Sequence, residues 1–485
     1  MNKSSTRGAP ARLLCLPPST ARAWPLLLSL GLSLLPLAGC SAISADGGFG
    51  AVERLTEQRI GQRPSYPRTA AQADFAAARV AELLGQTLTA DGAVEIALLN
   101  NRELQAGYAE LGIAEADWVR AGRLANPSLS FGRLGGPGGV EIDRAVLFDV
   151  LGLLRLPMTR QLEQTRFEQA QLQAAAATVE LAAEARAAFF EAVAAQQLAD
   201  YQGQVMDAAD ASSELARRML AAGNFNRLAH LREQSFQAEA STALARARHR
   251  AVAARERLVR LLGLGSEQLR LLQLPARLPD LPAAPAGPGD AEQAAMGQRL
   301  DVLMAKRAAQ ASARSLGLTK ATRFVNVLDA GYQNKNQPGE RRSNGYVIEL
   351  ELPLFDFGSA RAARAEASYM QALHRAAAVG LNAQSEVREA YSAYRSAYDI
   401  ARRYQDELLP LRKRISEENL LRYNGMLLSV FELLADAREQ IAGVIGAVES
   451  QRDYWVAETR LQTALAGRWP GTEAAAKAAA AALDH

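Results

Sequence analysis

The sequence predicts a mainly helical chain with a small amount of amphipathic β-strand, and three observations support this prediction. About half of the 485 residues are hydrophobic, yet aromatic residues make up only 6%, and much of the rest is alanine. Such a composition favours long, closely packed helices and does not favour one large aromatic core. Short segments of alternating apolar and polar residues interrupt the helical pattern. The parts also recur at an offset of roughly 200 residues, so we expect two structural repeats.

The N-terminus carries the pattern of an export signal. Basic residues up to Arg22 precede an apolar run that ends in LAGC at Cys40. A basic n-region, an apolar h-region and small residues before a cleavage site are typical of a secretory signal. The run is too short and too interrupted by proline for a comfortable membrane span. Without the four basic residues before Cys40, 51 basic residues face 52 acidic ones, so the neutral body indicates no nucleic-acid partner.

The end of this signal resembles the lipobox of bacterial lipoproteins, in which the cysteine is lipidated and becomes the first mature residue. The alternative is an ordinary signal with a chance cysteine. Cys15 and Cys40 are the two cysteines, and Cys15 lies inside the signal, so no disulfide can form within the mature chain. Acylation, as with palmitate, would give Cys40 a function.

Two pairs of alternating segments predict β-hairpins at about residues 126–150 and 323–355. In the first hairpin, Glu141 and Asp143 alternate with apolar residues. In the second, Glu349 and Glu351 alternate with the apolar series from Tyr346 to Leu352. Outside the signal, no segment has about 18 or more unbroken apolar residues. If this exported chain enters a membrane, it would therefore do so as β-strands. The acidic residues would then face a water-filled lumen.

Long helices follow each hairpin. No proline occurs between Met158 and Leu274, and Gly223 divides this run into a first arm of about 65 residues and a shorter return arm. The second copy turns near Gly425, and Pro410 is expected to kink or interrupt its outgoing helix. The segments that we expect are a signal peptide (1–39), an N-terminal lipidated linker (40–87), a first repeat (88–273), a proline-rich linker (274–290), a second repeat (291–467) and an alanine-rich tail (468–485).

Together these parts resemble the TolC-like outer-membrane efflux proteins. The resemblance rests on the lipobox, the hairpins that end in LFDVLG and in LPLFDFGSARAARAEA, and the turn YNG followed by LLADAREQ. It implies an outer-membrane homotrimer in which each protomer lends four strands to one twelve-stranded barrel that continues into a periplasmic helical tunnel. It also implies a periplasmic adaptor and an inner-membrane pump, of the RND type, as partners. Four strands cannot close a barrel alone, and open edges do not occur in lipid, so trimerisation follows physically.

The helical turns are the candidate docking site for the adaptor. Gly223 and Gly425 are expected to be left-handed residues that end the helices. Exposed apolar residues in a polar turn indicate an interface. The expected docking residues are Gly223, Asn224, Phe225, Gly425, Met426, Leu427 and Leu428. Acids just inside this tip line the entrance in the family, which makes Glu432 and Asp436 candidates for a gate; a solvated helix face is the equal alternative. The stripe of Tyr391, Tyr394 and Tyr398 is interpreted as helix packing.

Catalytic and cofactor motifs are absent from the sequence. There is no phosphate-binding loop, nucleophile elbow, HExxH or CxxC, and the four histidines are isolated. We therefore expect no enzyme activity, no cofactor and no metal site. Two alternatives to an efflux channel stay open: a periplasmic adaptor lipoprotein and the exit duct of a type I protein secretion system. A purely structural coiled coil would need sustained heptads, which are missing. The sequence leaves drugs, metal ions and proteins open as cargo.

Overall fold

The computed structural model describes residues 43–137, 139–287, 291–324, 327–351 and 357–468. Contacts divide the chain into Met1–Ala42 and Ile43–His485, and the described residues belong to the second of these units. The signal peptide, Cys40, the LPLFD segment at 352–356 and residues 469–485 of the tail therefore lie outside the described residues.

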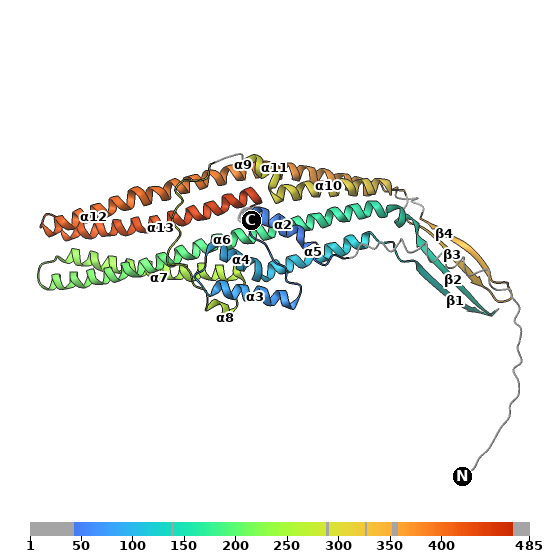
Figure 1. Ribbon diagram of the computed structural model, residues 1–485, viewed down its shortest axis with the longest axis horizontal. Coiled ribbons are helices and arrows are strands. Elements are labelled where there is room, and N and C mark those ends of the chain that lie inside the picture. The colour runs from blue at the N-terminus through green and yellow to red at the C-terminus, as the bar shows by residue number, and fades with distance from the viewer. Residues whose placement is uncertain (1–42, 138, 288–290, 325–326, 352–356, 469–485) are drawn as a thin grey trace, which may run out of the picture. The chain divides into compact units, whose positions relative to one another are not determined.

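The first half of the chain is helical apart from one β-hairpin (Figure 1). Its elements are α2 (Phe49–Ile60), α3 (Ala70–Leu84), α4 (Ala90–Asn100), α5 (Arg102–Ala121), β1 (Ser128–Gly136), β2 (Gly139–Asp149), α6 (Val150–Ala221), α7 (Arg227–Leu262) and α8 (Ser266–Leu269).

The second half has a similar order of elements. They are α9 (Ala291–Gln298), α10 (Leu300–Ala321), β3 (Leu328–Asn336), β4 (Ser343–Leu350), α11 (Ser359–Arg403), the π-helix η2 (Tyr404–Leu408), α12 (Leu409–Asn424) and α13 (Val430–Ala466).

Helix α6 is the central element of the described unit. It has 72 residues, about 110 Å at 1.5 Å per residue, and it begins directly where β2 ends, with Asp149 accepting a hydrogen bond from the Gly152 amide. Many of its buried residues are alanines, such as Ala175, Ala185 and Ala209. Small side chains let neighbouring helices approach closely, and α6 contacts α2, α4, α5, α7, α10 and α13.

The outgoing arm of the second half is interrupted where Pro410 was expected to disturb it. The π-helix η2 lies between α11 and α12, and Pro410 is the second residue of α12. Proline has no N–H to donate to the preceding turn, and a single π turn is a common way to absorb such a defect. Tyr404 of η2 packs against Gly446 of α13, where an added Cβ would lie 2.7 Å from the tyrosine hydroxyl.

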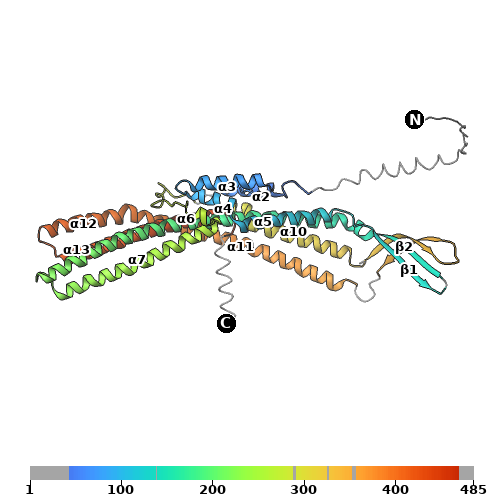
Figure 2. The same ribbon diagram turned by 90° about the horizontal axis from the view of Figure 1, so that it is seen from below.

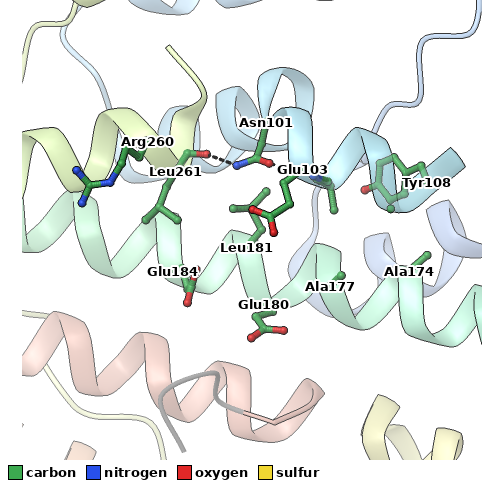
Figure 3. Close-up of a pocket in the computed structure, with 12 residues that line it drawn as sticks. Asn101, Glu103, Tyr108, Ala174, Ala177, Glu180, Leu181, Glu184, Arg260 and Leu261 are labelled. Atoms are coloured by element: carbon green, nitrogen blue, oxygen red, sulfur yellow. Dashed lines mark hydrogen bonds between the residues drawn. The ribbon is translucent and has the colours of Figure 1, made fainter. Parts of the chain in front are cut away.

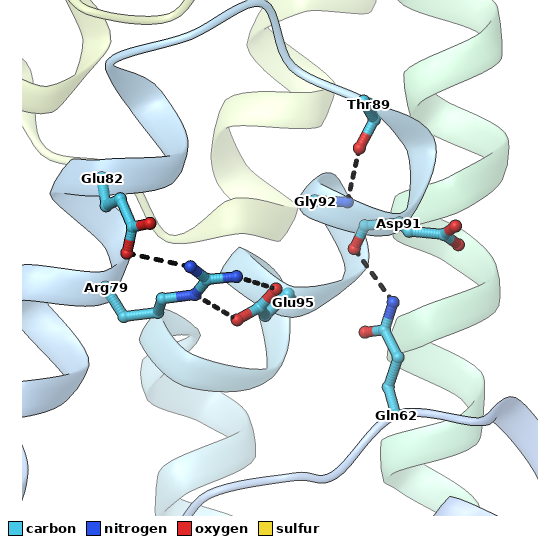
Figure 4. A network of polar contacts seen from close by, with 7 residues as sticks. All are labelled: Gln62, Arg79, Glu82, Thr89, Asp91, Gly92 and Glu95. Atoms are coloured by element: carbon cyan, nitrogen blue, oxygen red, sulfur yellow. Dashed lines mark hydrogen bonds and ion pairs between the residues drawn. The ribbon is translucent and has the colours of Figure 1, made fainter.

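The N-terminal segment is not the simple linker that the sequence suggested. It contains α2 and α3, and α2 packs on α6. The guanidinium of Arg79 on α3 pairs with Glu95 of α4 at 2.7 Å and with Glu82 at 2.9 Å (Figure 4). Asp91 of α4 also pairs with Arg186 of α6 at 2.5 Å. These ion pairs and apolar contacts attach the segment to the side of the long helices.

Side chains of the helices hold the proline-rich linker in place by donating hydrogen bonds to its backbone carbonyls. Trp455 donates to the Pro279 carbonyl at 3.0 Å, and Tyr398 donates to the Ala283 carbonyl at 3.0 Å. Tyr394 and Tyr398 are buried in a cluster with Tyr454. The interpretation of the tyrosine stripe as packing is confirmed.

Chain order sets the strands and the two helical turns at opposite ends of the long helices. Helix α6 leaves β2 at its first residue and reaches its turn 72 residues later, and α11 and α12 run the same way in the second half (Figure 1, Figure 2). Among the described helices, none is both long and apolar enough to cross a membrane.

Candidate functional site: the two-faced sheet and the helical turns

The four strands form one antiparallel sheet in the order β1-β2-β3-β4. Residues directly opposite each other on neighbouring strands point to the same face of a sheet. Tyr346 lies opposite Tyr332, Tyr332 opposite Val146, and Val146 opposite Leu129. A row of four apolar side chains therefore crosses all four strands on one face.

The register extends this apolar face over most of the sheet. Its apolar members are Leu129, Phe131, Val140, Ile142, Val146, Phe148, Leu328, Ala330, Tyr332, Tyr346, Ile348 and Leu350. Most of these large side chains are exposed in the single chain. Arg133 and Arg144 share this face, which the alternation in the sequence did not reveal. A face of this size needs an apolar surrounding to cover it.

The opposite face of the sheet is polar and mainly acidic. Glu349 lies opposite Asp329, and Asp329 lies opposite Asp149, so three carboxylates form a row across three strands. Asp143 shares this face and lies 3.8 Å from the ammonium of Lys335.

Two more of the expected acidic residues belong to the polar side. Glu141 shares the face with Asp143 and accepts a hydrogen bond from Gln337 at 3.0 Å. Glu351 follows β4, two residues after Glu349, and its amide donates to the Val327 carbonyl at 3.3 Å. Like charges directly opposite each other destabilise a sheet unless water solvates them, so this face suits an aqueous space.

The turn between α6 and α7 ends α6 on a left-handed glycine. Gly223 has φ of 78°, and its amide donates to the Leu220 carbonyl at 3.0 Å. The amide of Asn224 donates to the Met219 carbonyl at 2.9 Å, which completes a Schellman motif. Asn226 then caps α7 through the Ala229 amide at 2.7 Å. The left-handed conformation expected for Gly223 at the end of the helix is confirmed.

The turn between α12 and α13 has the same hydrogen bonds but a different left-handed residue. We expected Gly425 in that conformation, and this was wrong: its φ is −78°, whereas Met426 has φ of 60°. The amide of Met426 donates to the Tyr423 carbonyl at 2.9 Å, and that of Leu427 to the Arg422 carbonyl at 2.8 Å. The motif therefore closes one residue later than the glycine.

Exposure separates the expected docking residues into two groups. Met426 and Leu427 are 94% and 81% exposed. Phe225 and Leu428 were expected to be exposed as well, but each is half-buried. Met426 is also the one non-glycine residue with positive φ in the described chain. A left-handed non-glycine residue is strained, and such strain concentrates at functional sites.

Several solved structures of membrane proteins are similar to this chain. A membrane protein from Pseudomonas aeruginosa is 21% identical, with a TM-score of 0.68 over 78% of this chain and 90% of that one. The outer-membrane protein VceC from Vibrio cholerae is 15% identical, with a TM-score of 0.64 over 78% and 96%. The MtrE outer-membrane channel of Neisseria gonorrhoeae, in its open state, is 17% identical, with a TM-score of 0.63 over 78% and 89%. No family model and no curated protein matches the sequence. The chain has the TolC-like fold.

In this TolC-like chain the two candidate gate residues have different surroundings. Glu432 is exposed and forms a capping box: it accepts from the amide and the hydroxyl of Ser429, both at 3.0 Å. These bonds, the backbone one first, lower the pKa of Glu432. Asp436 is buried, and one of its carboxylate oxygens has no hydrogen-bond partner within the described residues. One turn of helix therefore separates a solvated acid from a buried one.

The TolC-like helices also line a cavity, partly open to solvent, that the sequence did not indicate. It measures about 440 Å³ and lies where α5, α6 and the end of α7 meet (Figure 3). Glu103, Glu180, Glu184 and Arg260 line it beside apolar side chains. Burial raises the pKa of Glu184; nearby Arg257 opposes this effect and Glu103 adds to it. The lining residues are far apart in sequence, so no local pattern could have predicted this cavity.

Proposed function

We propose that this chain is the outer-membrane channel component of a tripartite efflux system, which passes substrates from an inner-membrane pump and a periplasmic adaptor to the exterior. The observation that carries this proposal is the two-faced sheet that continues without a break into α6. One face of the sheet suits lipid and the other suits water, and α6 begins at the residue after β2 ends. The TolC-like fold, shared with structures described as an outer-membrane protein and an outer-membrane channel, supports the same conclusion.

The sheet requires copies of itself to span a bilayer. Strands β1 and β4 are its two edges, and their outer backbone groups have no strand partner within the described sheet. Unpaired backbone groups are too costly in lipid, so the edges must close on other strands. Three copies would supply twelve strands, with Ile348 and Leu350 toward lipid and Glu141, Asp143, Glu349 and Glu351 toward the lumen. Arg144 is at the middle of β2 and Arg133 is near the middle of β1, so their long side chains would have to extend along the sheet to reach the headgroups.

The two halves of the chain are proposed to be structural repeats of helix, hairpin and long helical hairpin. Their long helices would form the periplasmic tunnel of the trimer. Glu432 and Asp436, just inside the second turn, remain candidates for its gate. Arg438, two residues after Asp436, pairs with the buried Glu233 of α7 at 3.2 Å, so an opening of this end would have to break or move that contact.

The turns are proposed to dock the periplasmic adaptor. Met426 and Leu427 expose apolar surface at the end of the helices, and Met426 does so at a position where glycine would be less strained. A residue kept in spite of strain and exposure favours a contact outside the protomer. Gly223, Asn224, Phe225, Gly425 and Leu428 complete the docking surface.

Cys40 is proposed to be the lipid-anchored first residue of the mature chain. We expect Cys40→Ser to abolish labelling with palmitate, while the protein still reaches the outer membrane because the strands hold it there. Membrane fractions from cells fed with labelled palmitate give the measurement. An unlabelled native protein would contradict the anchor.

The efflux proposal is tested by deleting the gene in the native organism and measuring the export of a dye. Loss of the gene is expected to raise the accumulation of an exported dye, and the native gene is expected to restore it. Crosslinking of purified protein is expected to give a trimer. Normal dye export in the deleted strain, with no other outer-membrane channel of this fold present, would contradict the function. A stable monomer in the outer membrane would contradict the barrel.

A further inference from the structure

A second cavity lies nearer the turns, between α6, α7 and α13. It measures about 450 Å³, and two arginines of α7, Arg246 and Arg250, line it one helical turn apart. Its floor is built from small or aliphatic side chains, among them Ala195, Leu198 and Ile445. The cavity therefore combines apolar surface with two neighbouring arginines.

This second cavity, which we call the groove, opens on a face of the helices that the proline-rich linker does not cover. On α13 the linker bonds to Gln451 and Trp455, whereas Ile445, Glu449 and Arg452 line the groove. Successive residues of an α-helix are rotated by about 100°, so the two sets occupy different faces of α13. The linker also bonds to Gln197 of α6, and Gln197 does not line the groove.

The charges in the groove do not cancel. Glu191 pairs with Arg257 at 2.8 Å, and Arg452 pairs with its neighbour Asp453 at 2.7 Å. Glu449 contributes one negative charge. Arg246 and Arg250 are exposed and form no ion pair with the described residues.

Two unpaired arginines in this arrangement favour an anion. Like charges four residues apart on a helix repel each other, and an anion between them would replace this repulsion by attraction. The planar guanidinium group matches the two oxygens of a carboxylate.

We infer that this groove binds amphipathic organic carboxylates, with the carboxylate held by Arg246 and Arg250 and the apolar body on the floor formed by Ala195, Leu198 and Ile445. The binding itself follows from the groove. Its role as a station for anionic cargo along the tunnel rests on the proposed efflux function.

The test is a titration of the purified full-length protein with 2-naphthoate and with 2-naphthamide, which has nearly the same shape and no charge. Saturation-transfer NMR measures the binding of each probe. We expect saturable binding of the carboxylate and at least fivefold weaker binding of the amide. Arg246→Ala and Arg250→Ala are each expected to weaken carboxylate binding by about tenfold, because each removes a charge-assisted hydrogen bond.

Arg248→Ala is the matched control. Arg248 is exposed on the same helix between the two arginines but does not line the groove, so its removal changes the net charge by the same amount. We expect less than a twofold effect. Equal weakening by all three variants, equal binding of the amide, or no saturable binding would each overturn the inference.

These measurements use neither adaptor nor pump. Normal dye export in a strain without the gene would overturn the efflux function and leave the measured affinity standing. Loss of selective carboxylate binding would overturn the groove and leave export intact.

Discussion

In each half of the chain, the residue that precedes one helix binds the end of a returning helix, and we call this attachment a joint. The two halves use different side chains for it. Asn101 caps α5, and Arg299 occupies the corresponding position before α10; each of these helices leads to a β-hairpin. Both side chains reach back to the end of a returning helix: Asn101 donates to the Leu261 carbonyl of α7 at 3.0 Å, and Arg299 donates to the Ala464 carbonyl of α13 at 2.9 Å. A neutral amide serves one half and a fully buried guanidinium serves the other.

The two joints differ in what their central side chain requires from its surroundings. The amide of Asn101 has only hydrogen bonds to satisfy. Arg299 brings a charge, which Asp301 and Glu386 compensate at 2.7 Å each. Burial lowers the pKa of Arg299, but the two carboxylates raise it by more, so the group remains charged. The second joint therefore depends on three residues at once.

The largest expected loss of stability comes from a substitution at Arg299, in the joint that contains a buried charge. Arg299→Leu leaves two partly buried carboxylates without a counter-charge, and we expect it to destabilise the protein by about 3 kcal/mol or more. Asn101→Ala removes a helix cap and one further hydrogen bond, so a loss of about 1–2 kcal/mol is expected. Thermal unfolding of the purified proteins, followed by circular dichroism, ranks the two variants.

Neutralising the partners sharpens this comparison. The triple variant Arg299→Leu, Asp301→Asn, Glu386→Gln removes the uncompensated charge, so we expect it to recover most of the lost stability. If Arg299→Leu and Asn101→Ala unfold at the same temperature, the charge has no special role and the two joints are equivalent.

The sequence could indicate that these two joints correspond, but not how they work. NNRELQAG at Asn101 and GQRLDVLMA at Arg299 match loosely, at an offset of roughly 200 residues that is similar to the offset of the hairpins. Glu386 lies 87 residues from Arg299, and Ala464 lies 165 residues away, so no local pattern could predict this burial. Alternation with a period of two did predict the two faces of the strands, because it depends on backbone geometry alone.

The next effect compares the hairpins of the two halves. Phe148→Arg and Ile348→Arg each place a charge on the apolar face, in one cross-strand row that runs through Ala330. Each is expected to cost about 2–4 kcal/mol if that row lies near mid-membrane. Glu349→Arg, on the polar face, is expected to insert normally and to change the ion selectivity of the channel. The amount of heat-resistant oligomer in outer-membrane fractions gives the measurement. A difference between Phe148→Arg and Ile348→Arg would show that the two hairpins do not lie at the same depth. Equal behaviour of Ile348→Arg and Glu349→Arg would contradict the lipid and lumen faces.

The two turns differ in a way that concerns partners more than stability. Replacing both Met426 and Leu427 with aspartate removes exposed apolar surface and adds charges that an apolar interface would have to desolvate. We expect adaptor binding to weaken by about 2 kcal/mol or more, with folding and oligomeric state unchanged. Co-purification with the adaptor, together with dye export in cells, measures the effect. The double variant Ser241→Asp, Thr242→Asp adds the same two charges at exposed positions of α7 outside both turns and is the control. Normal adaptor binding by the double variant would exclude this turn as the docking surface, and loss of the oligomer would place these residues in the protein core.

The smallest expected effect separates the stability of the second turn from its function. The two turns share their hydrogen bonds, but Gly223 adopts the left-handed conformation without strain and Met426 does not. Met426→Gly is therefore expected to stabilise the α12–α13 turn by up to about 1 kcal/mol, and Gly223→Met to destabilise the α6–α7 turn by a similar amount. Hydrogen exchange at the amides of Leu427 and Asn224, which close the two motifs, measures each change. If Met426 is kept for its side chain, Met426→Gly will slow exchange at Leu427 and at the same time weaken adaptor binding. If exchange slows and adaptor binding is unchanged, the strain at Met426 has no part in docking, and the contact must come from Leu427 and its neighbours.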